Sequence, residues 1–353
     1  MLNNSLFTTE SFLPVSGTHR QILKYPEAEE LVTLELRHTL EQNLHIFILF
    51  INIFGVVTNS INLRVFVRQG IASDTTTIGL SALALSDLMG CIFMIPASLC
   101  YVVKFVNYTD YRNCVSLTSM TCHYPHVMFS RITCWLTVYI SLERTLCVLM
   151  PLKVKFLLRP RVARNAVLAI FVFFFIFHVP FAANSRIIWV FNPAFNRSMT
   201  LNVVTEIGLV FLYLNSLIGT TILSTVAMVI VAITTSVMLY KLKTIQKWRK
   251  SISSASKSDS KTSKKDLEVF KTVTMVTAIY LLCLIGGHTP GFAMLFFPGV
   301  SITGVNSNLF LVMYTFKYVF DAVNSSVNFL FYIHISSKFN ATFNSLYSRK
   351  YRD

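Results

Sequence analysis

The chain alternates between long hydrophobic runs and short polar segments. Seven runs are long and apolar enough to form helices, and they span residues 46–67, 78–103, 131–150, 167–183, 207–239, 269–297 and 309–335. About 20 consecutive apolar residues in a helix cross the hydrocarbon core of a bilayer. The pattern therefore predicts an all-α membrane protein, a bundle of seven transmembrane helices.

Composition supports lipid as the solvent of these runs. The 353 residues are 54% hydrophobic and only 13% charged, which is more apolar than an average soluble domain. A net charge of +15 would suit a nucleic-acid partner, but the cations lie in short segments between the apolar runs, so we expect none. The sequence carries no HExxH, GxSxG or P-loop motif and no Cys/His cluster. We therefore expect neither an enzyme nor a metal centre.

Charge and glycosylation signals agree on the orientation. Lys and Arg gather after the first, third, fifth and seventh runs, the positive-inside pattern for a cytoplasmic face. Glycosylation sequons at Asn3, Asn107 and Asn196 fall on the opposite face. We expect a multi-pass protein of the plasma membrane with its N-terminus outside. Its expected parts are an extracellular tail (1–45), the seven-helix domain (46–335), a cytoplasmic Lys/Ser-rich loop (241–265) and a cytoplasmic tail that begins as a short amphipathic helix (336–353).

Polar side chains within the runs mark candidate sites. Asp87 in the second run is the most costly of them, because a carboxylate in a bilayer needs partners. In the seventh run, polar residues spaced by three, four and four positions share one helix face; they are Asp321, Asn324, Asn328 and Tyr332. The oxygen-bearing residues that could join Asp87 are Asn59, Thr133, Asn324 and Asn328. This set suits either a sodium ion or a water-bridged cluster that holds helices together.

The third run contains three charged residues. Glu143 and Arg144 stand side by side near its end. Either they mark the membrane edge, where a long arginine reaches the headgroups, or Arg144 is a switch that carboxylates hold in one state and release in another. Arg131 is a buried cation of the same run, and Asp321 or Glu206 could neutralise it.

Four motifs, in the right runs and order, resemble one known family. They are Gly55 with Asn59, the segment LSALALSD ending at Asp87, Glu143-Arg144-Thr145 with the Pro-Leu-Lys that follows it, and Asn328 with Tyr332. Over nearly its whole length the chain resembles a rhodopsin-like (class A) G-protein-coupled receptor. Its sequence also resembles those of invertebrate neuropeptide-type and molluscan chemosensory-type receptors.

The resemblance implies a receptor that binds an extracellular ligand and activates a heterotrimeric G protein, with arrestin and receptor kinases as further partners. It implies that Arg144 contacts the G protein, that Asp266 or Glu268 pairs with Arg144 at rest, and that Tyr332 swings inward on activation. Glu143 belongs to the same switch.

The ligand pocket implied by the resemblance lies between the third, fifth, sixth and seventh spans. Polar candidates at that depth are His126, Ser130, His288, Tyr314, Lys317, Tyr318 and Asp321. His126 stands where amine receptors carry an aspartate, which disfavours a cationic amine and leaves a peptide favoured over a chemosensory small molecule. For each histidine, a satisfied interhelical hydrogen bond is the alternative to ligand contact.

The sequence also departs from the family pattern. The seventh run lacks the proline before Tyr332, the fifth run has no proline, and the sixth has Cys283-Leu-Ile-Gly286 where the family has Cys-Trp-x-Pro. The loop between the fourth and fifth runs has no cysteine, which leaves open a pairing of Cys114 with Cys122 before the third run. The alternative function is a membrane transporter or ion-conducting protein that uses Asp87, Arg131 and Asp321, although no internal repeat is visible.

Overall fold

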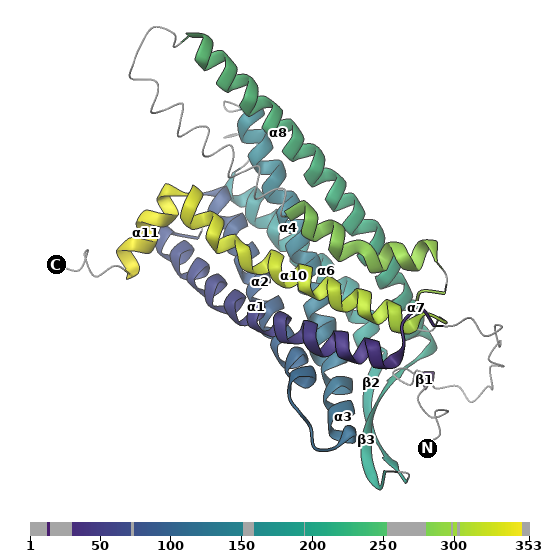
Figure 1. The fold of residues 1–353 in the computed structure, drawn as a ribbon. Helices are drawn as coiled ribbons and strands as arrows, with labels where there is room; N and C mark the ends of the chain where they lie inside the picture. The colour runs from purple at the N-terminus through teal and green to yellow at the C-terminus, as the bar shows by residue number, and fades with distance from the viewer. Residues whose placement is uncertain are drawn as a thin grey trace.

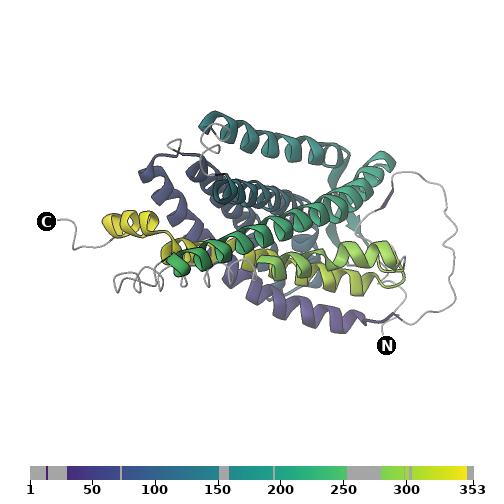
Figure 2. The same cartoon turned by 90° about the horizontal axis from the view of Figure 1, so that it is seen from above.

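The computed structural model describes residues 13–14, 30–71, 74–150, 159–193, 195–252, 280–297, 299–301 and 304–347. Long helices run side by side through an elongated bundle (Figure 1); they are α1 (Leu34–Gln69), α2 (Thr75–Val102), α4 (Tyr124–Leu149), α6 (Pro160–Ala183), α8 (Ser224–Ile252) and α10 (Ser307–Ile335). Seen from above, α6 lies on one side of α4, and α1 lies on the other side of the bundle (Figure 2).

Shorter helices extend or flank these long ones. They are α3 (Tyr108–Thr118), α7 (Glu206–Leu214), α11 (Ser337–Tyr347) and an apolar helix at Tyr280–Phe296. Two π-helical segments, Ser119–His123 and Asn215–Leu223, join α3 to α4 and α7 to α8. Each pair therefore forms one continuous rod.

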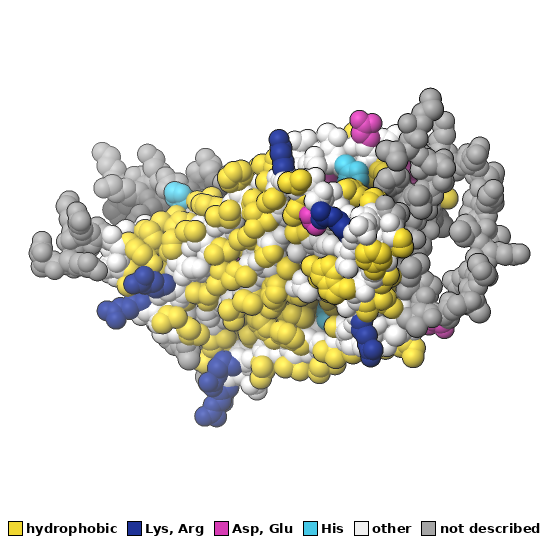
Figure 3. Space-filling model, turned by 90° about the horizontal axis from the view of Figure 1, so that it is seen from below, with side chains coloured by type: hydrophobic (Ala, Val, Ile, Leu, Met, Phe, Trp, Pro, Cys, Tyr) yellow, Lys and Arg dark blue, Asp and Glu magenta, His cyan; other side chains and the backbone are white. Residues whose placement is uncertain are grey.

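Five helical rods are long and apolar enough to cross a membrane, namely Leu34–Gln69, Thr75–Val102, Tyr108–Leu149, Pro160–Ala183 and Glu206–Ile245. The sixth predicted run forms the shorter helix Tyr280–Phe296 in its described part, and the seventh forms α10. Every predicted run is thus helical where it is described, while the count of seven spans stays a prediction. Figure 3 shows a broad hydrophobic band across one face, with Lys and Arg side chains toward its edges.

Two helices begin earlier than the hydrophobic pattern indicates. The predicted tail extended to residue 45, yet α1 starts at Leu34, where the Thr33 hydroxyl accepts a hydrogen bond from the Leu36 amide (3.2 Å). The third rod starts at Tyr108 rather than near residue 131. Both extensions carry many polar residues, so hydropathy alone did not reveal them, although the Thr33 cap is the expected start signal of a helix.

A β-hairpin stands at one end of the bundle, opposite α11 (Figure 1). Strands β2 (Ser185–Asn192) and β3 (Arg197–Val204) pair antiparallel, and β1 (Leu13–Pro14) pairs parallel with the other edge of β3. Asn196 has a φ of 49° at the hairpin turn. We call this the hairpin end and the opposite one the α11 end.

Asparagines attach the hairpin to the third rod. Asn113 of α3 accepts from the Thr200 amide (2.8 Å) and donates to the Ser198 carbonyl (3.2 Å). Asn202 donates to the Ser116 carbonyl (3.1 Å). These bonds connect the loop between α6 and α7 to α3 without a cysteine in that loop.

The disulfide differs from the predicted one. Cys114 is bonded to Cys100 of α2, and Cys122 is a free thiol, so the pairing of Cys114 with Cys122 is wrong. The segment between those two residues is helical, and eight residues of helix rise about 12 Å, more than a disulfide can bridge. The Cα atoms of Cys100 and Cys114 lie 5.6 Å apart.

Candidate functional site

The first polar cluster is centred on Asp87, whose side chain is buried within the bundle. The Thr133 hydroxyl of α4 donates to Oδ1 (2.8 Å), and the Asn328 amide of α10 donates to Oδ2 (2.8 Å). Three helices therefore converge on one carboxylate, as the sequence predicted for these residues.

The other two predicted members lie beside this cluster. Asn59 of α1 donates to the Ser325 carbonyl of α10 (2.8 Å) rather than to Asp87. Asn324 lines a neighbouring cavity. Carboxylate and hydroxyl oxygens have the chemistry that a sodium ion requires, but both oxygens of Asp87 already accept bonds from protein donors. An ion would have to share Asp87 with Thr133 and Asn328.

That cavity lies between α4, the α7–α8 rod, Tyr280–Phe296 and α10. Four predicted ligand-pocket residues line it, namely Ser130, His288, Lys317 and Asp321. Arg131 lines it as well. The remaining three candidates, His126, Tyr314 and Tyr318, are not among its lining residues.

Two side chains of the bundle face Asp321. Lys317 of the same helix donates to its carboxylate. His126 Nε2 lies 3.5 Å from Asp321 Oδ2, while its Nδ1 lies 3.0 Å from the Gly90 carbonyl. A carbonyl only accepts, so Nδ1 carries a proton. His126 also packs against the Tyr318 ring, with centroids 5.5 Å apart, and Tyr318 lies 6.2 Å from Tyr314.

Arg131 donates its hydrogen bonds to neutral groups, and neither of its predicted counter-ions, Asp321 and Glu206, contacts it directly. Its Nη1 contacts His178 Nε2 and Asn215 Oδ1, each at 3.0 Å. Its Nη2 donates to the Asn215 carbonyl (2.9 Å) and to the Thr220 hydroxyl (2.5 Å).

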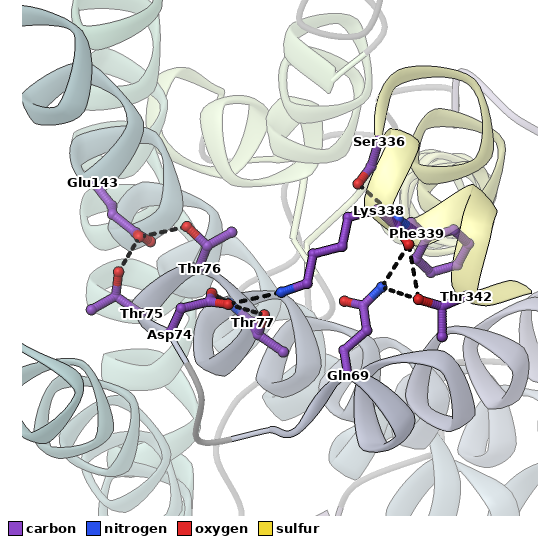
Figure 4. Close-up of polar contacts among 10 residues, drawn as sticks. All are labelled: Gln69, Asp74, Thr75, Thr76, Thr77, Glu143, Ser336, Lys338, Phe339 and Thr342. Atoms are coloured by element: carbon purple, nitrogen blue, oxygen red, sulfur yellow. Dashed lines mark hydrogen bonds and ion pairs between the residues drawn. The ribbon is translucent and has the colours of Figure 1, made fainter.

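At the α11 end, Glu143 is buried but does not pair with its neighbour. Its Oε1 accepts hydrogen bonds from the Thr75 and Thr76 hydroxyls at 2.6 and 2.8 Å (Figure 4). Its Oε2 has no hydrogen-bond partner among the described residues. Arg144 is exposed, and no hydrogen bond or ion pair of the described chain includes it. Its predicted partners Asp266 and Glu268 lie outside the described residues.

A second set of contacts ties α11 to the start of α2 (Figure 4). Asp74 caps α2 by accepting from the Thr77 amide (2.7 Å), and Lys338 of α11 lies 3.1 Å from the Asp74 carboxylate. Partial burial alone would raise the pKa of Asp74, but the bonds from Thr77 and Lys338 outweigh it and hold the pKa below its ordinary value. Gln69 donates to the Lys338 carbonyl (3.2 Å).

Tyr332 lies at the same end, against an aromatic group that joins three helices. Its ring centroid is 5.5 Å from those of Phe66 in α1 and Phe339 in α11. Phe339 is fully buried in this contact. The predicted inward movement of Tyr332 would have to break this packing.

Of the predicted glycosylation sites, Asn107 is the residue just before α3 and Asn196 is exposed at the hairpin turn, both toward the hairpin end. Asn3 lies outside the described residues. Modification of any of them stays a prediction.

Sequence reasoning missed the side chains that hold Arg131 and Glu143. Asn215 and His178 are isolated polar residues inside apolar runs. Polar groups are costly inside a membrane, so both positions qualify as candidate site residues. Thr75 and Thr76 follow Asp74, and Asp74 with Thr77 is a helix-start signature. That signature could have placed the threonines in the first turn of α2.

The helical bundle thus contains a cavity lined by buried polar residues and, at the α11 end, a charged, partly exposed region around Glu143 and Arg144. The family model described as "Serpentine type 7TM GPCR chemoreceptor Srw" matches residues 46–350. The chain belongs to this family of seven-transmembrane chemoreceptors, which is a receptor class and not an enzyme class. No curated protein matches the chain.

Proposed function

We propose that this protein is a plasma-membrane receptor that binds its ligand from outside at the hairpin end and activates a heterotrimeric G protein at the α11 end. The observation that carries the proposal is the exposed position of Arg144 beside a buried Glu143 that α2 hydroxyls hold. An exposed guanidinium at the end of α4 is available to a protein partner, whereas Glu143 fixes the α4–α2 contact next to it.

In this scheme the bundle has two states, which the ligand and the G protein bias from opposite ends. Asp87 lies between those ends, where Thr133 and Asn328 link α4 and α10 to α2. We propose that sodium binds to this cluster in the resting state, because the residues there supply carboxylate and hydroxyl oxygens.

Three finer assignments also belong to this proposal. The receptor is of the rhodopsin-like type, with seven spans and its N-terminus outside. A peptide is the favoured ligand and a small chemosensory molecule the alternative. Arrestin and receptor kinases act on the cytoplasmic side. The family match supports the receptor class and the seven spans, and the charge pattern of the sequence supports the orientation.

The test is a ligand screen in cells that express the full chain with a promiscuous G protein. Peptide and small-molecule libraries are applied to wild type, to Arg144→Ala and to Arg68→Ala, an exposed cation near the same end that serves as the matched control. We expect a G-protein response that Arg144→Ala abolishes and Arg68→Ala keeps. A response that survives Arg144→Ala contradicts the switch, and a ligand-gated current without a G protein favours a channel.

The sodium proposal has a separate measurement. Ligand affinity of wild type should fall as sodium replaces a bulky organic cation at constant ionic strength. Asp87→Asn should remove this dependence. If both proteins show the same dependence on sodium, the cluster is structural only.

A further inference from the structure

Arg131 contributes a positive charge to the cavity wall, and no carboxylate contacts it directly. The side chain is 7% exposed, and its hydrogen bonds go to His178, Asn215 and Thr220. His178 is neutral here: its Nδ1 lies 2.8 Å from the Phe174 carbonyl, so Nδ1 carries the proton and Nε2 accepts from Arg131. No ion pair of the described residues includes Arg131.

The other charges of the cavity wall balance each other. Lys317 and Asp321 form an ion pair four residues apart on α10, so the one carboxylate of the wall is already paired with a cation other than Arg131. A buried charge without a partner is costly inside a membrane protein, and such residues usually mark functional sites. The cavity therefore has one positive charge in excess.

Unused donors accompany that charge. A guanidinium has five N–H groups, and four of those of Arg131 are used by the contacts described above, which leaves Nε–H without a partner. His288, also 7% exposed, lines the same cavity, and neither of its ring nitrogens has a hydrogen-bond partner among the described residues. Two buried polar groups thus lack acceptors at the same cavity.

The backbone is shaped to hold Arg131 in place. The π-helical segment Asn215–Leu223 supplies both the Asn215 carbonyl and the Thr220 hydroxyl. A Cβ atom at Gly219 would lie 2.5 Å from Arg131 Nη1, so a larger residue there would displace the guanidinium. π-Helical segments inside longer helices often occur at functional sites.

We propose that the cavity binds a ligand through a carboxylate group, which accepts hydrogen bonds from Arg131 Nε and from His288. A monoanion matches the single excess charge. This inference rests on the proposed receptor function and adds the chemical class of the ligand. The carboxylate belongs either to a small organic acid or to the free C-terminus of a peptide.

The experiment compares each acid with its uncharged amide. The panel pairs aliphatic and aromatic acids with their primary amides, and short peptides having free C-termini with the same peptides amidated. Two readouts are taken on the full chain: G-protein signalling in cells, and the melting temperature of the purified receptor in detergent at constant ionic strength. If the acid is preferred among the small molecules, the source is a small organic acid. If it is preferred among the peptides, the source is a peptide C-terminus.

For wild type we expect at least one acid to exceed its amide in potency by about tenfold, the worth of one charge-assisted hydrogen bond. Arg131→Gln should remove this preference, and Arg131→Lys should keep part of it. Lys104→Gln, which removes an exposed cation, is the matched control and should keep all of it.

Two results overturn the inference: no acid is preferred over its amide by wild type, or the preference persists in Arg131→Gln. If Arg131→Gln fails to reach the surface, His288→Phe replaces it, and an unchanged preference there also overturns the inference. Stabilisation by acids without any G-protein signal would refute the proposed function and leave the carboxylate site standing. Signalling without any preference for acids would support the proposed function and overturn the carboxylate site.

Discussion

The contact between Glu143 and the first turn of α2 can be tested by removing both hydroxyls. Thr75→Val with Thr76→Val keeps the volume of each side chain but leaves the buried Glu143 carboxylate without its two donors at 2.6 and 2.8 Å. A hydrogen bond to a charged group contributes about 1.5–3 kcal/mol. Both donors share one oxygen, so their effects are not additive, and we expect a loss of about 3 kcal/mol in total.

The assay is the thermal stability of the purified protein, measured in two backgrounds. A change of 1 kcal/mol shifts the melting temperature of a large domain by about 2 °C, so the double variant should melt about 6 °C below wild type. In a Glu143→Leu background, where no carboxylate remains, the same two changes should cost less than about 1 kcal/mol.

The matched control is the pair Thr39→Val and Thr244→Val. These exposed hydroxyls donate only to carbonyls of their own helices, so we expect little change from them. Equal losses in the two Glu143 backgrounds would refute the reasoning, because the threonines would then stabilise α2 without contacting Glu143.

Three further predictions follow from the fold. Cys100→Ser should lower the free energy of unfolding by about 3 kcal/mol, the value for a disulfide that closes a short loop, whereas Cys122→Ser, which alters a free thiol, should leave it unchanged in the same melting assay. Gly286→Ala should lower the melting temperature, because a Cβ there would overlap the ring of Phe320; an unchanged value would show that the two helices can separate at no cost. The lowered pKa of Asp74 means that its ionised form stabilises the fold at neutral pH and that this contribution is lost as the pH falls through the folded-state pKa; Asp74→Asn should therefore show a smaller fall in melting temperature between pH 7 and acidic pH than wild type, and parallel curves would contradict this.

Hydrophobic length predicted where the helices lie, because the bilayer requires it. It failed where helices leave the apolar region: the extension at Leu34 begins with the Thr33 cap, and the extension at Tyr108 is held by a disulfide and by hydrogen bonds to the hairpin, none of which a hydropathy pattern contains. It also missed the β-hairpin, which is short and depends on hydrogen bonds from Asn113 of a distant segment.

The candidate sites, too, could be predicted from the sequence only in part. Asp87, Thr133 and Asn328 could be predicted to meet, because a carboxylate in a bilayer needs partners and the other two are oxygen-bearing residues of other apolar runs. The sequence marks Asn215 and His178 as costly polar residues, but their pairing with Arg131 could not be predicted, since charge alone favoured a carboxylate. The structure instead pairs four of the five guanidinium N–H groups with a carbonyl and neutral side chains, which depends on how α6 and the α7–α8 rod sit against α4.

The departures from the family pattern acquire a physical meaning in the structure. The fifth run has no proline, but its rod is irregular at the π-helical segment Asn215–Leu223, since a π-helical turn disturbs a helix as a proline does. Gly286 replaces the usual proline of the sixth run and permits close contact with α10. The missing loop cysteine is offset by the hydrogen bonds of Asn113 and Asn202. Each absent motif is thus accompanied by another feature: a helix irregularity, a close contact between helices, or hydrogen bonds between segments. The absence of the motifs does not by itself argue for a receptor that cannot signal.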